Sequence, residues 1–336
     1  MRWYHVAMGM LAMAASMVAV SAFAEGPHKT LRAGMIGLDT SHAPAFAKVL
    51  TDPKAEGDLA DVRLVAAFPG GSPDLPSSRD RVAGYTADLK KLGVEIVGSI
   101  DELLKRVDVV FVESVDGRPH LEQVRPVLAA HKPVFVDKPC AGTLADVIEI
   151  FRLAQQNNVP CFSASSLRFS PDFQSLRNDP KVGAVRGVDS SGPCSLEPHH
   201  PDLFWYGVHG VEMLFTVMGT GCKSVTRVHT EGTDFVVGVW EDGRIGTFRG
   251  KRDGKYSYNL LVHGARGTGY ADKYGGYVPL IVEICKFFKT GKPPVSAAET
   301  IEIFAFMEAA DESKREGGCP VTLQSVIAKA QQQAAK

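Results

Sequence analysis

The sequence predicts a two-domain α/β protein, with a doubly wound parallel sheet followed by an α+β domain whose sheet is mainly antiparallel. Between residues 31 and 166, short β-rich runs alternate with helical stretches. Between 167 and 320, one β-rich run follows another across turn signals. Alternating β and α segments require parallel strands, because each crossover takes a dozen or more residues. A chain of 336 residues that is 45% hydrophobic and 22% charged can bury two cores.

Strands and helices of the first domain are expected where apolar runs match the period of each element. The expected strands are 32–36, 62–68, 109–112, 134–136 and 160–163, and the expected helices are 43–50, 100–105, 121–130 and 144–157. Residues 70–80, with two glycines and two prolines, are expected to form an irregular loop. This order of elements is that of a Rossmann-type domain.

The second domain is expected to contain six strands and three helices. The strands are predicted at 185–190, 224–231, 235–240, 244–249, 257–263 and 267–271, and the helices at 208–218, 278–289 and 297–314. Turn signals between several strands favour antiparallel pairing, and the helices are expected to cover one face of this sheet. Residues 321–336 are expected to form a C-terminal tail.

Residues 1–24 predict a signal peptide. An apolar run from Val6 to Ala24 follows Arg2, with Ala22 and Ala24 as the small residues before the expected cleavage site. An uncleaved membrane anchor is the alternative, since the run is nearly long enough to span a bilayer. We therefore expect export to the periplasm or the extracellular space, and no membrane attachment after cleavage.

The charge of the chain limits its expected binding partners, and the spacing of its cysteines bears on disulfides and metal sites. The formal net charge is -1, and the Lys and Arg residues are scattered rather than massed, so nucleic acid is not an expected partner. The six cysteines have no CxxC or metal-type spacing, and disulfides are permitted in an exported protein although their pairing cannot be deduced. Cys285 lies in an apolar stretch and is expected to be buried. A small molecule is the expected partner.

One motif late in the first domain carries a family resemblance. The run Phe135–Pro139 resembles the Glu-Lys-Pro signature of the glucose-fructose oxidoreductase / inositol dehydrogenase (Gfo/Idh/MocA) family. Four further segments match the pattern of that family between residues 31 and 320: His120, Arg168-Phe169-Ser170-Pro171, Gly207-Val208-His209 and Ser296-Ala297-Ala298-Glu299. The chain resembles a divergent, exported member.

The resemblance implies an oxidoreductase that acts on a sugar or polyol with NAD or NADP, and it also implies a homo-oligomer. Lys138 and His209 would then be the catalytic pair. Lys138 follows a strand and would face the crevice where open sheets bind ligands, and His is suited to proton transfer near neutral pH. The alternatives are a solvated surface cation for Lys138 and a structural histidine for His209.

The glycine-rich turn departs from the family pattern. A dinucleotide site uses Gly-x-Gly-x-x-Gly so that the backbone can approach the pyrophosphate, but here the stretch is Gly37-Leu38-Asp39-Thr40-Ser41-His42. Pro69 stands where an Asp or Glu would hold the ribose. The residues expected to bind the cofactor are Gly37, Asp39, Thr40, Ser41, Ser114, His120 and Lys138.

A second interpretation of this turn stays open. In it, the loop forms part of a sugar or metal site, with six side chains converging at the sheet edge: Asp39, His42, Glu113, Asp116, His120 and Lys138. Asp39 and His42, at i and i+3, suit a turn-borne ligand pair, but this signal is too loose to predict a metal site, and none is assigned. A capping role for Asp39 and Thr40 is equally open.

The substrate is expected to contact polar and aromatic side chains of both domains. These are Glu113, Asp116, Arg168, His199, His200, Trp205 and Tyr206, because ring faces stack on sugar C–H groups while polar atoms bind hydroxyls; surface-loop histidines are the plain alternative for the His pair. A redox-silent carbohydrate lyase, hydrolase or epimerase, or a non-catalytic sugar-binding protein, is the alternative function.

Overall fold

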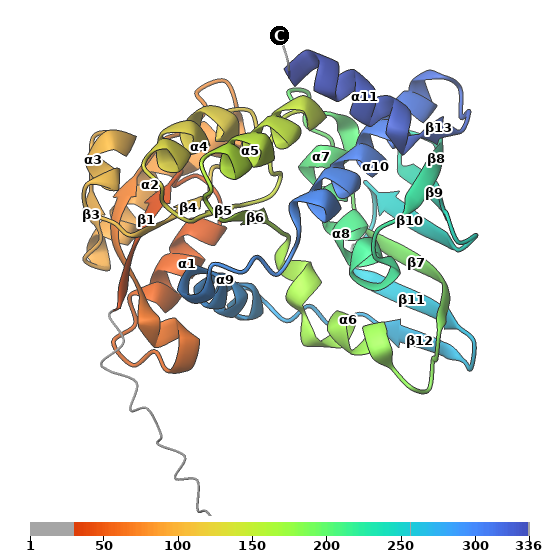
Figure 1. Cartoon of the computed structure of the whole chain (residues 1–336), viewed down its shortest axis with the longest axis horizontal. Helices are drawn as coiled ribbons and strands as arrows, with labels where there is room; N and C mark the ends of the chain where they lie inside the picture. Colours follow the sequence, from red (N-terminus) through yellow and green to blue (C-terminus); the bar gives the residue numbers. More distant parts are fainter. Residues whose placement is uncertain (1–29, 256, 335–336) are drawn as a thin grey trace, which may run out of the picture.

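The computed structural model describes residues 30–255 and 257–334, which form two sheets with their helices (Figure 1). The predicted signal peptide, residues 1–24, lies outside the described residues. Among the helices that are described, none combines the length and apolar character needed to cross a bilayer.

The first sheet has six parallel strands in the order β3-β2-β1-β4-β5-β6, which confirms the predicted Rossmann-type parallel sheet; the two-residue strand β3 was not predicted. Its strands are β1 (Leu31–Ile36), β2 (Val62–Phe68), β3 (Glu95–Ile96), β4 (Val109–Val112), β5 (Val134–Val136) and β6 (Cys161–Ser163). The strand order reverses between β1 and β4, and such a switch point is where open α/β sheets bind ligands.

The helices of the first domain agree with the prediction except in one place. They are α1 (His42–Leu50), α2 (Pro76–Lys91), α3 (Ile100–Leu104), α4 (His120–Ala129) and α5 (Leu144–Gln156). The expectation of an irregular loop over 70–80 is wrong from Pro76 onward, where α2 begins with proline in its first turn. Only Ser78 and Leu89 of α2 are buried, so this helix carries no apolar stripe from which it could be predicted.

The second sheet has seven strands in the order β12-β11-β7-β10-β9-β8-β13. They are β7 (Val185–Pro193), β8 (Cys222–His229), β9 (Thr233–Trp240), β10 (Ile245–Lys251), β11 (Asn259–Gly264), β12 (Thr268–Ala271) and β13 (Val321–Thr322). The pairing is antiparallel except between β7 and β10, which run parallel. The predicted mainly antiparallel sheet is confirmed.

Two of the three predicted helices of the second domain pack against its sheet, and one does not. Helices α8 (Gly207–Met218) and α10 (Ala297–Arg315) contact the strands of this sheet. Helix α9 (Val278–Thr290) lies beside α1 instead (Figure 1). Its Phe287 and Phe288 pack on Phe162 and Phe111 of the first sheet, with ring centroids 4.8 and 5.1 Å apart. The chain therefore returns to the first domain after the second sheet.

The prediction of a C-terminal tail over residues 321–336 is also corrected by the structure. Residues Val321–Thr322 form β13, and Leu323–Ala334 form α11, which packs against α5 and β8. Leu323, Val326 and Ala330 are buried on one face of α11. This apolar spacing at i, i+3 and i+7 attaches the segment to the core.

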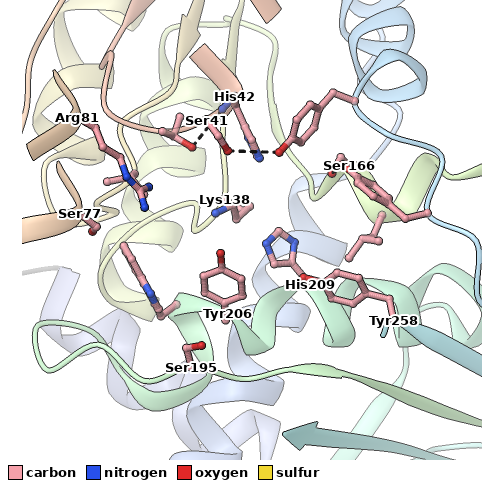
Figure 2. A pocket seen from close by; sticks show the side chains of 16 residues that line it. Ser41, His42, Ser77, Arg81, Lys138, Ser166, Ser195, Tyr206, His209 and Tyr258 are labelled. Carbon is pink, nitrogen blue, oxygen red and sulfur yellow. Dashed lines mark hydrogen bonds between the residues drawn. The ribbon is translucent and has the colours of Figure 1, made fainter. Parts of the chain in front are cut away.

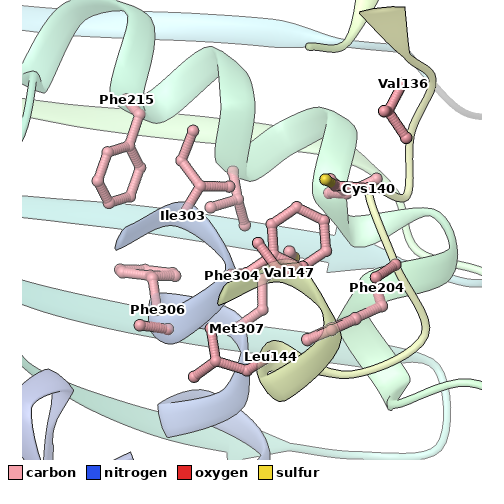
Figure 3. Close-up of a cluster of buried hydrophobic side chains, with 14 of the residues drawn as sticks. Val136, Cys140, Leu144, Val147, Phe204, Phe215, Ile303, Phe304, Phe306 and Met307 are labelled. Carbon is pink, nitrogen blue, oxygen red and sulfur yellow. The ribbon is translucent and has the colours of Figure 1, made fainter. Parts of the chain in front are cut away.

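A shared hydrophobic core joins the two domains. Figure 3 shows Leu144 and Val147 of α5 beside Phe304 and Met307 of α10 and Phe204, which belongs to the short helix α7 (Asp202–Trp205). Ring centroids of Phe204 and Phe304 lie 4.9 Å apart. Because close-packed cores resist shear, we infer that the space between the domains is largely preformed.

All six cysteines are free thiols in the structure. Cys285 is buried as predicted, as are Cys140, Cys161, Cys194 and Cys222, and only Cys319 is exposed.

Candidate active site

A pocket of about 420 Å³ opens between the two domains, above the carboxyl ends of β1, β4 and β5. Its walls come from the turn after β1, the loop after β5, the start of α2, the chain after β6, helices α7 and α8, and the segments around β11 and β12 (Figure 2). The lining residues are Thr40, Ser41, His42, Ser77, Arg81, Val115, Lys138, Ser166, Leu167, Ser195, Trp205, Tyr206, His209, Tyr258, Tyr274 and Tyr277.

The two predicted catalytic residues lie in this pocket on opposite walls. Lys138 follows β5 in the first domain, and His209 lies in the first turn of α8 in the second. Figure 2 shows both side chains turned toward the same space. His209 Nδ1 lies 2.7 Å from the hydroxyl oxygen of Ser165, which orients the ring. The structure therefore brings an ammonium group and an oriented imidazole together, as a proton-transfer pair requires.

The imidazole of His209 is held neutral by its surroundings. Burial, the nearby charge of Lys138 and that of His42 lower the pKa of His209 well below its ordinary value of 6.5. A neutral imidazole accepts a proton, so at neutral pH His209 has the protonation state of a general base.

The lowered pKa of His209 determines the expected pH dependence of turnover. Because the base form of His209 exists above its lowered pKa, kcat/KM is expected to stay on its plateau as the pH falls through 6.5, and to decline only below it. A pH–rate profile measured with His209 intact checks this. An acidic limb centred above pH 6.5 would contradict the assignment of His209 as the base.

Aromatic side chains form much of the pocket wall. Trp205, Tyr206, Tyr258, Tyr274 and Tyr277 all line it. The Lys138 ammonium lies 5.9 Å from the centre of the Tyr206 ring, and Tyr274 donates or accepts a hydrogen bond with Ser166 at 2.8 Å. Ring faces and phenol hydroxyls together suit a ligand with C–H faces and hydroxyl groups.

In the turn after β1, Gly37 is the one glycine of the dinucleotide-binding pattern that this sequence retains, and it adopts a tight turn. Gly37 has a φ of 89°, and a Cβ at this position would lie 2.4 Å from Ser114 N. Asp39 is fully buried, and its carboxylate accepts hydrogen bonds from the Val115 N–H at 2.9 Å and the Ser78 hydroxyl at 2.6 Å. Asp39 thus connects the turn after β1, the first turn of α2 and the loop after β4 without lining the pocket.

The loop after β4 is held by a network of charges. Asp116 is buried, accepts hydrogen bonds from Arg118, and lies 3.1 Å from His200 Nε2. Arg118 also pairs with Asp74, which lies 3.6 Å from the exposed His199. None of these five side chains lines the pocket. The predicted substrate residues Asp116, His199 and His200 instead connect the two domains beside it.

Three other predicted site residues serve the framework. His120 is buried, and its two ring nitrogens lie 2.9 and 3.2 Å from the carbonyl oxygens of Ser114 and Cys140. The Ser114 hydroxyl donates to Gln123 at 3.0 Å. Arg168 is buried between Glu212 and Glu299, at 2.5 and 2.7 Å. These three side chains do not line the pocket; His120 holds the loop that carries Lys138, and Arg168 holds Glu212 of the helix that carries His209.

A buried cluster of one imidazole and two carboxylates lies at the floor of the pocket. His42 Nδ1 lies 2.7 Å from an Asp137 oxygen and 4.0 Å from a Glu113 oxygen. Glu113 and Asp137 are both fully buried. Burial, and then the neighbouring Asp137, raise the pKa of Glu113 well above its ordinary value. Glu113, predicted as a substrate residue, is below the pocket surface rather than on it.

Several pocket residues were not predicted from the sequence. Ser77 and Arg81 lie on α2, which was expected to start as a loop. Tyr258 lies in the predicted strand 257–263, directly before β11, and Tyr274 and Tyr277 lie between β12 and α9. Asp137 was visible within the Phe135–Pro139 run. It follows a buried strand directly, which is the signal that could have found it.

Residues 31–165 match the model of a family described as an oxidoreductase family with an NAD-binding Rossmann fold, Gfo/Idh/MocA. The chain is 27% identical over 213 residues to myo-inositol 2-dehydrogenase of Thermotoga maritima, covering 54% of this chain and 63% of that protein. It is 29% identical over 171 residues to the Salmonella typhimurium protein YceM, named as an oxidoreductase, covering 51% and 50%. The chain thus matches about half to two-thirds of the length of these curated relatives.

Solved structures share the fold over nearly the whole chain. Scyllo-inositol dehydrogenase of Lactobacillus casei, with bound NAD(H) and scyllo-inositol, superposes with a TM-score of 0.71 at 16% identity, covering 88% of this chain and 100% of that one. GenD2 from gentamicin A biosynthesis, in complex with NAD, gives a TM-score of 0.70 at 18% identity, covering 94% and 99%. At these identities the likeness establishes the two-domain fold.

Proposed function

We propose that this chain is an oxidoreductase of the Gfo/Idh/MocA type that oxidises or reduces a sugar or polyol held between its two domains. The match of residues 31–165 to the model of that family, described as having an NAD-binding Rossmann fold, supports the proposal. The observation that carries the proposal is the convergence of Lys138 and His209 from separate domains on one aromatic-lined pocket. A pocket of about 420 Å³ has room for a sugar or inositol ring.

The proposed chemistry of the chain is proton transfer at a substrate hydroxyl. His209, neutral and oriented by Ser165, takes the proton of that hydroxyl. The Lys138 ammonium stabilises the negative charge that develops on the oxygen, and the surrounding rings exclude water. In the reverse direction, His209 returns the proton.

The pocket residues suit the nicotinamide ring of a cofactor. They suit its pyrophosphate less well. Gly37 retains a tight turn in which a Cβ would clash, and Thr40, Ser41 and Arg81 face the pocket at the start of α1 and α2. These would hold the phosphates, and Lys138 would lie at the nicotinamide. When bound, the nicotinamide would accept or supply the hydride. Asp39 opposes this by placing a carboxylate at the turn.

A non-redox carbohydrate enzyme, such as a lyase or epimerase, is the second candidate. The observation that favours it is the pair of hydrogen bonds from Asp39 to Val115 and Ser78, which tie together the loops that a dinucleotide crosses. Leu75 also packs against Val115 and Trp205, across the region that a bound dinucleotide would occupy. Both candidates use Lys138 and His209.

Turnover of a panel of inositols, aldoses and polyols tests the proposal. The protein is incubated with each compound, with and without NAD or NADP, and products are followed by NMR and nicotinamide absorbance. We expect conversion of at least one compound that depends on added nicotinamide. Conversion that proceeds equally without it would favour the second candidate. Export and oligomerisation stay predictions, from residues 1–24 and the family resemblance respectively.

A further inference from the structure

Three strands of the first sheet bring His42, Glu113 and Asp137 together. His42 is the first residue of α1, after β1, and Glu113 and Asp137 directly follow β4 and β5. These strands are neighbours in the sheet, so their carboxyl ends meet. One potential ligand atom from each residue lies within 4.8 Å of the other two.

The three side chains of this cluster lie close enough for one cation to bind between them. His42 Nδ1 lies 2.7 Å from Asp137 Oδ2, the distance of a direct ion pair, and 4.0 Å from Glu113 Oε2, and neither carboxylate oxygen of Glu113 has a hydrogen-bond partner among the described residues. Ligands at about 2.1 Å from a metal ion lie about 3 Å apart when adjacent and about 4 Å apart when opposed.

The burial of Glu113 points to a missing positive partner. Both of its carboxylate oxygens are buried, and neither has a hydrogen-bond partner among the residues that the structure describes. A carboxylate without a partner is costly to bury. Asp137 beside it adds a second buried carboxylate, and Lys138, the neighbouring cation, extends toward the pocket.

The histidine is held in place as a metal ligand would be. The His42 ring stacks on Phe46 with centroids 5.6 Å apart and planes 7° apart, and it contacts Tyr277 at 4.6 Å. This packing keeps Nδ1 directed at the two carboxylates. Fixed orientation of a ligating imidazole strengthens metal binding, because less freedom is lost on coordination.

We propose that His42, Glu113 and Asp137 bind one divalent transition-metal ion of the Zn²⁺ or Mn²⁺ class. An imidazole favours such ions over Ca²⁺ or Mg²⁺, and two carboxylates accept both Zn²⁺ and Mn²⁺. Three protein ligands leave a coordination position open, as in catalytic metal sites. Because His42 also lines the pocket beside Lys138, the ion would lie next to the pocket.

The role of the ion in turnover rests on the proposed function, whereas metal binding itself does not. Hydroxyl oxygens of a sugar or polyol are the groups that would complete its coordination. A chain that binds metal but converts no sugar would contradict the proposed function alone. A chain that converts sugars but binds no metal would contradict this inference alone.

Metal titration of the EDTA-treated full chain tests the site. With ZnCl₂ and MnCl₂ as the probes in calorimetry, we expect one equivalent of at least one ion to bind per chain. Glu113→Gln is expected to weaken that binding about 100-fold or more, because an amide is a poor ligand for these ions. Glu302→Gln is the matched control, since Glu302 binds the N–H groups of Gly221 and Cys222 in the second domain; it should bind metal like the unaltered chain.

Thermal unfolding guards against a variant that merely fails to fold. Without metal, Glu113→Gln is expected to unfold at the same temperature as the unaltered chain or a higher one, because an unpartnered buried carboxylate has been removed. Added metal should raise the unfolding temperature of the unaltered chain but not of the variant. The inference is overturned if the folded chain binds neither ion stoichiometrically, or if Glu113→Gln binds as tightly as the unaltered chain.

Discussion

Replacing His209 or Lys138 by alanine is expected to lower kcat/KM by about 100- to 10,000-fold for any compound that the protein converts. General acid–base catalysis contributes factors of this size. In the proposed mechanism, His209, 2.7 Å from Ser165 Oγ, acts as the oriented base, and Lys138 supplies the positive charge on the opposite wall. Steady-state kinetics with each variant, after circular dichroism has confirmed folding, measures the loss.

Exposed residues of the same types provide the controls for these variants. His263 lies on β11 and pairs with Asp189, and Lys286 pairs with Glu283 on α9, both away from the pocket. Alanine at either position should leave kcat/KM unchanged. Full activity of both His209→Ala and Lys138→Ala would show that the reaction takes place elsewhere, under either candidate function.

Asp39→Gly is expected to tighten the binding of nicotinamide cofactor by about one to three decades. A carboxylate about 4 Å from a phosphate opposes binding by on the order of 1–4 kcal/mol, depending on screening. Glycine also removes the hydrogen bonds to Val115 and Ser78 that hold neighbouring loops across the crevice. Both effects act in the same direction. Calorimetric titration at about pH 8 is suitable, because burial raises the pKa of Asp39 and the carboxylate should be ionised.

Asp39→Asn separates charge from shape at the same position. The amide removes the negative charge but keeps the size of the side chain, so its affinity for nicotinamide should lie between those of the unaltered chain and Asp39→Gly. If neither variant binds more tightly than the unaltered chain, Asp39 does not control access to the pyrophosphate seat.

The sheet of the first domain could be predicted because its strands are continuous apolar runs. Strands such as Val109–Val112 are buried on both faces, which requires such runs and makes them visible. Helix α2 could not be predicted, since its buried face consists of little more than Ser78 and Leu89. The packing of α9 against the first domain could not be predicted either. An amphipathic pattern shows that one face of a helix is buried, but not which sheet it packs against.

The site residues that could be predicted from the sequence either directly follow a strand or belong to a family motif. Lys138 and His209 came from such motifs, and Trp205 and Tyr206 from their neighbourhood. The tyrosines at 258, 274 and 277 reach the pocket only through the path of the second sheet. The cluster of His42, Glu113 and Asp137 depends on three strands that are distant in sequence, so its geometry required the fold.

Titration of the cofactor-free, unaltered protein with NAD and NADP, each oxidised and reduced, tests the proposed oxidoreductase most directly. The proposal predicts saturable binding of at least one of the four, with one site per chain. No binding at millimolar cofactor, from protein shown to be folded and free of bound nucleotide, would contradict it and leave the non-redox carbohydrate enzyme as the function of Lys138 and His209.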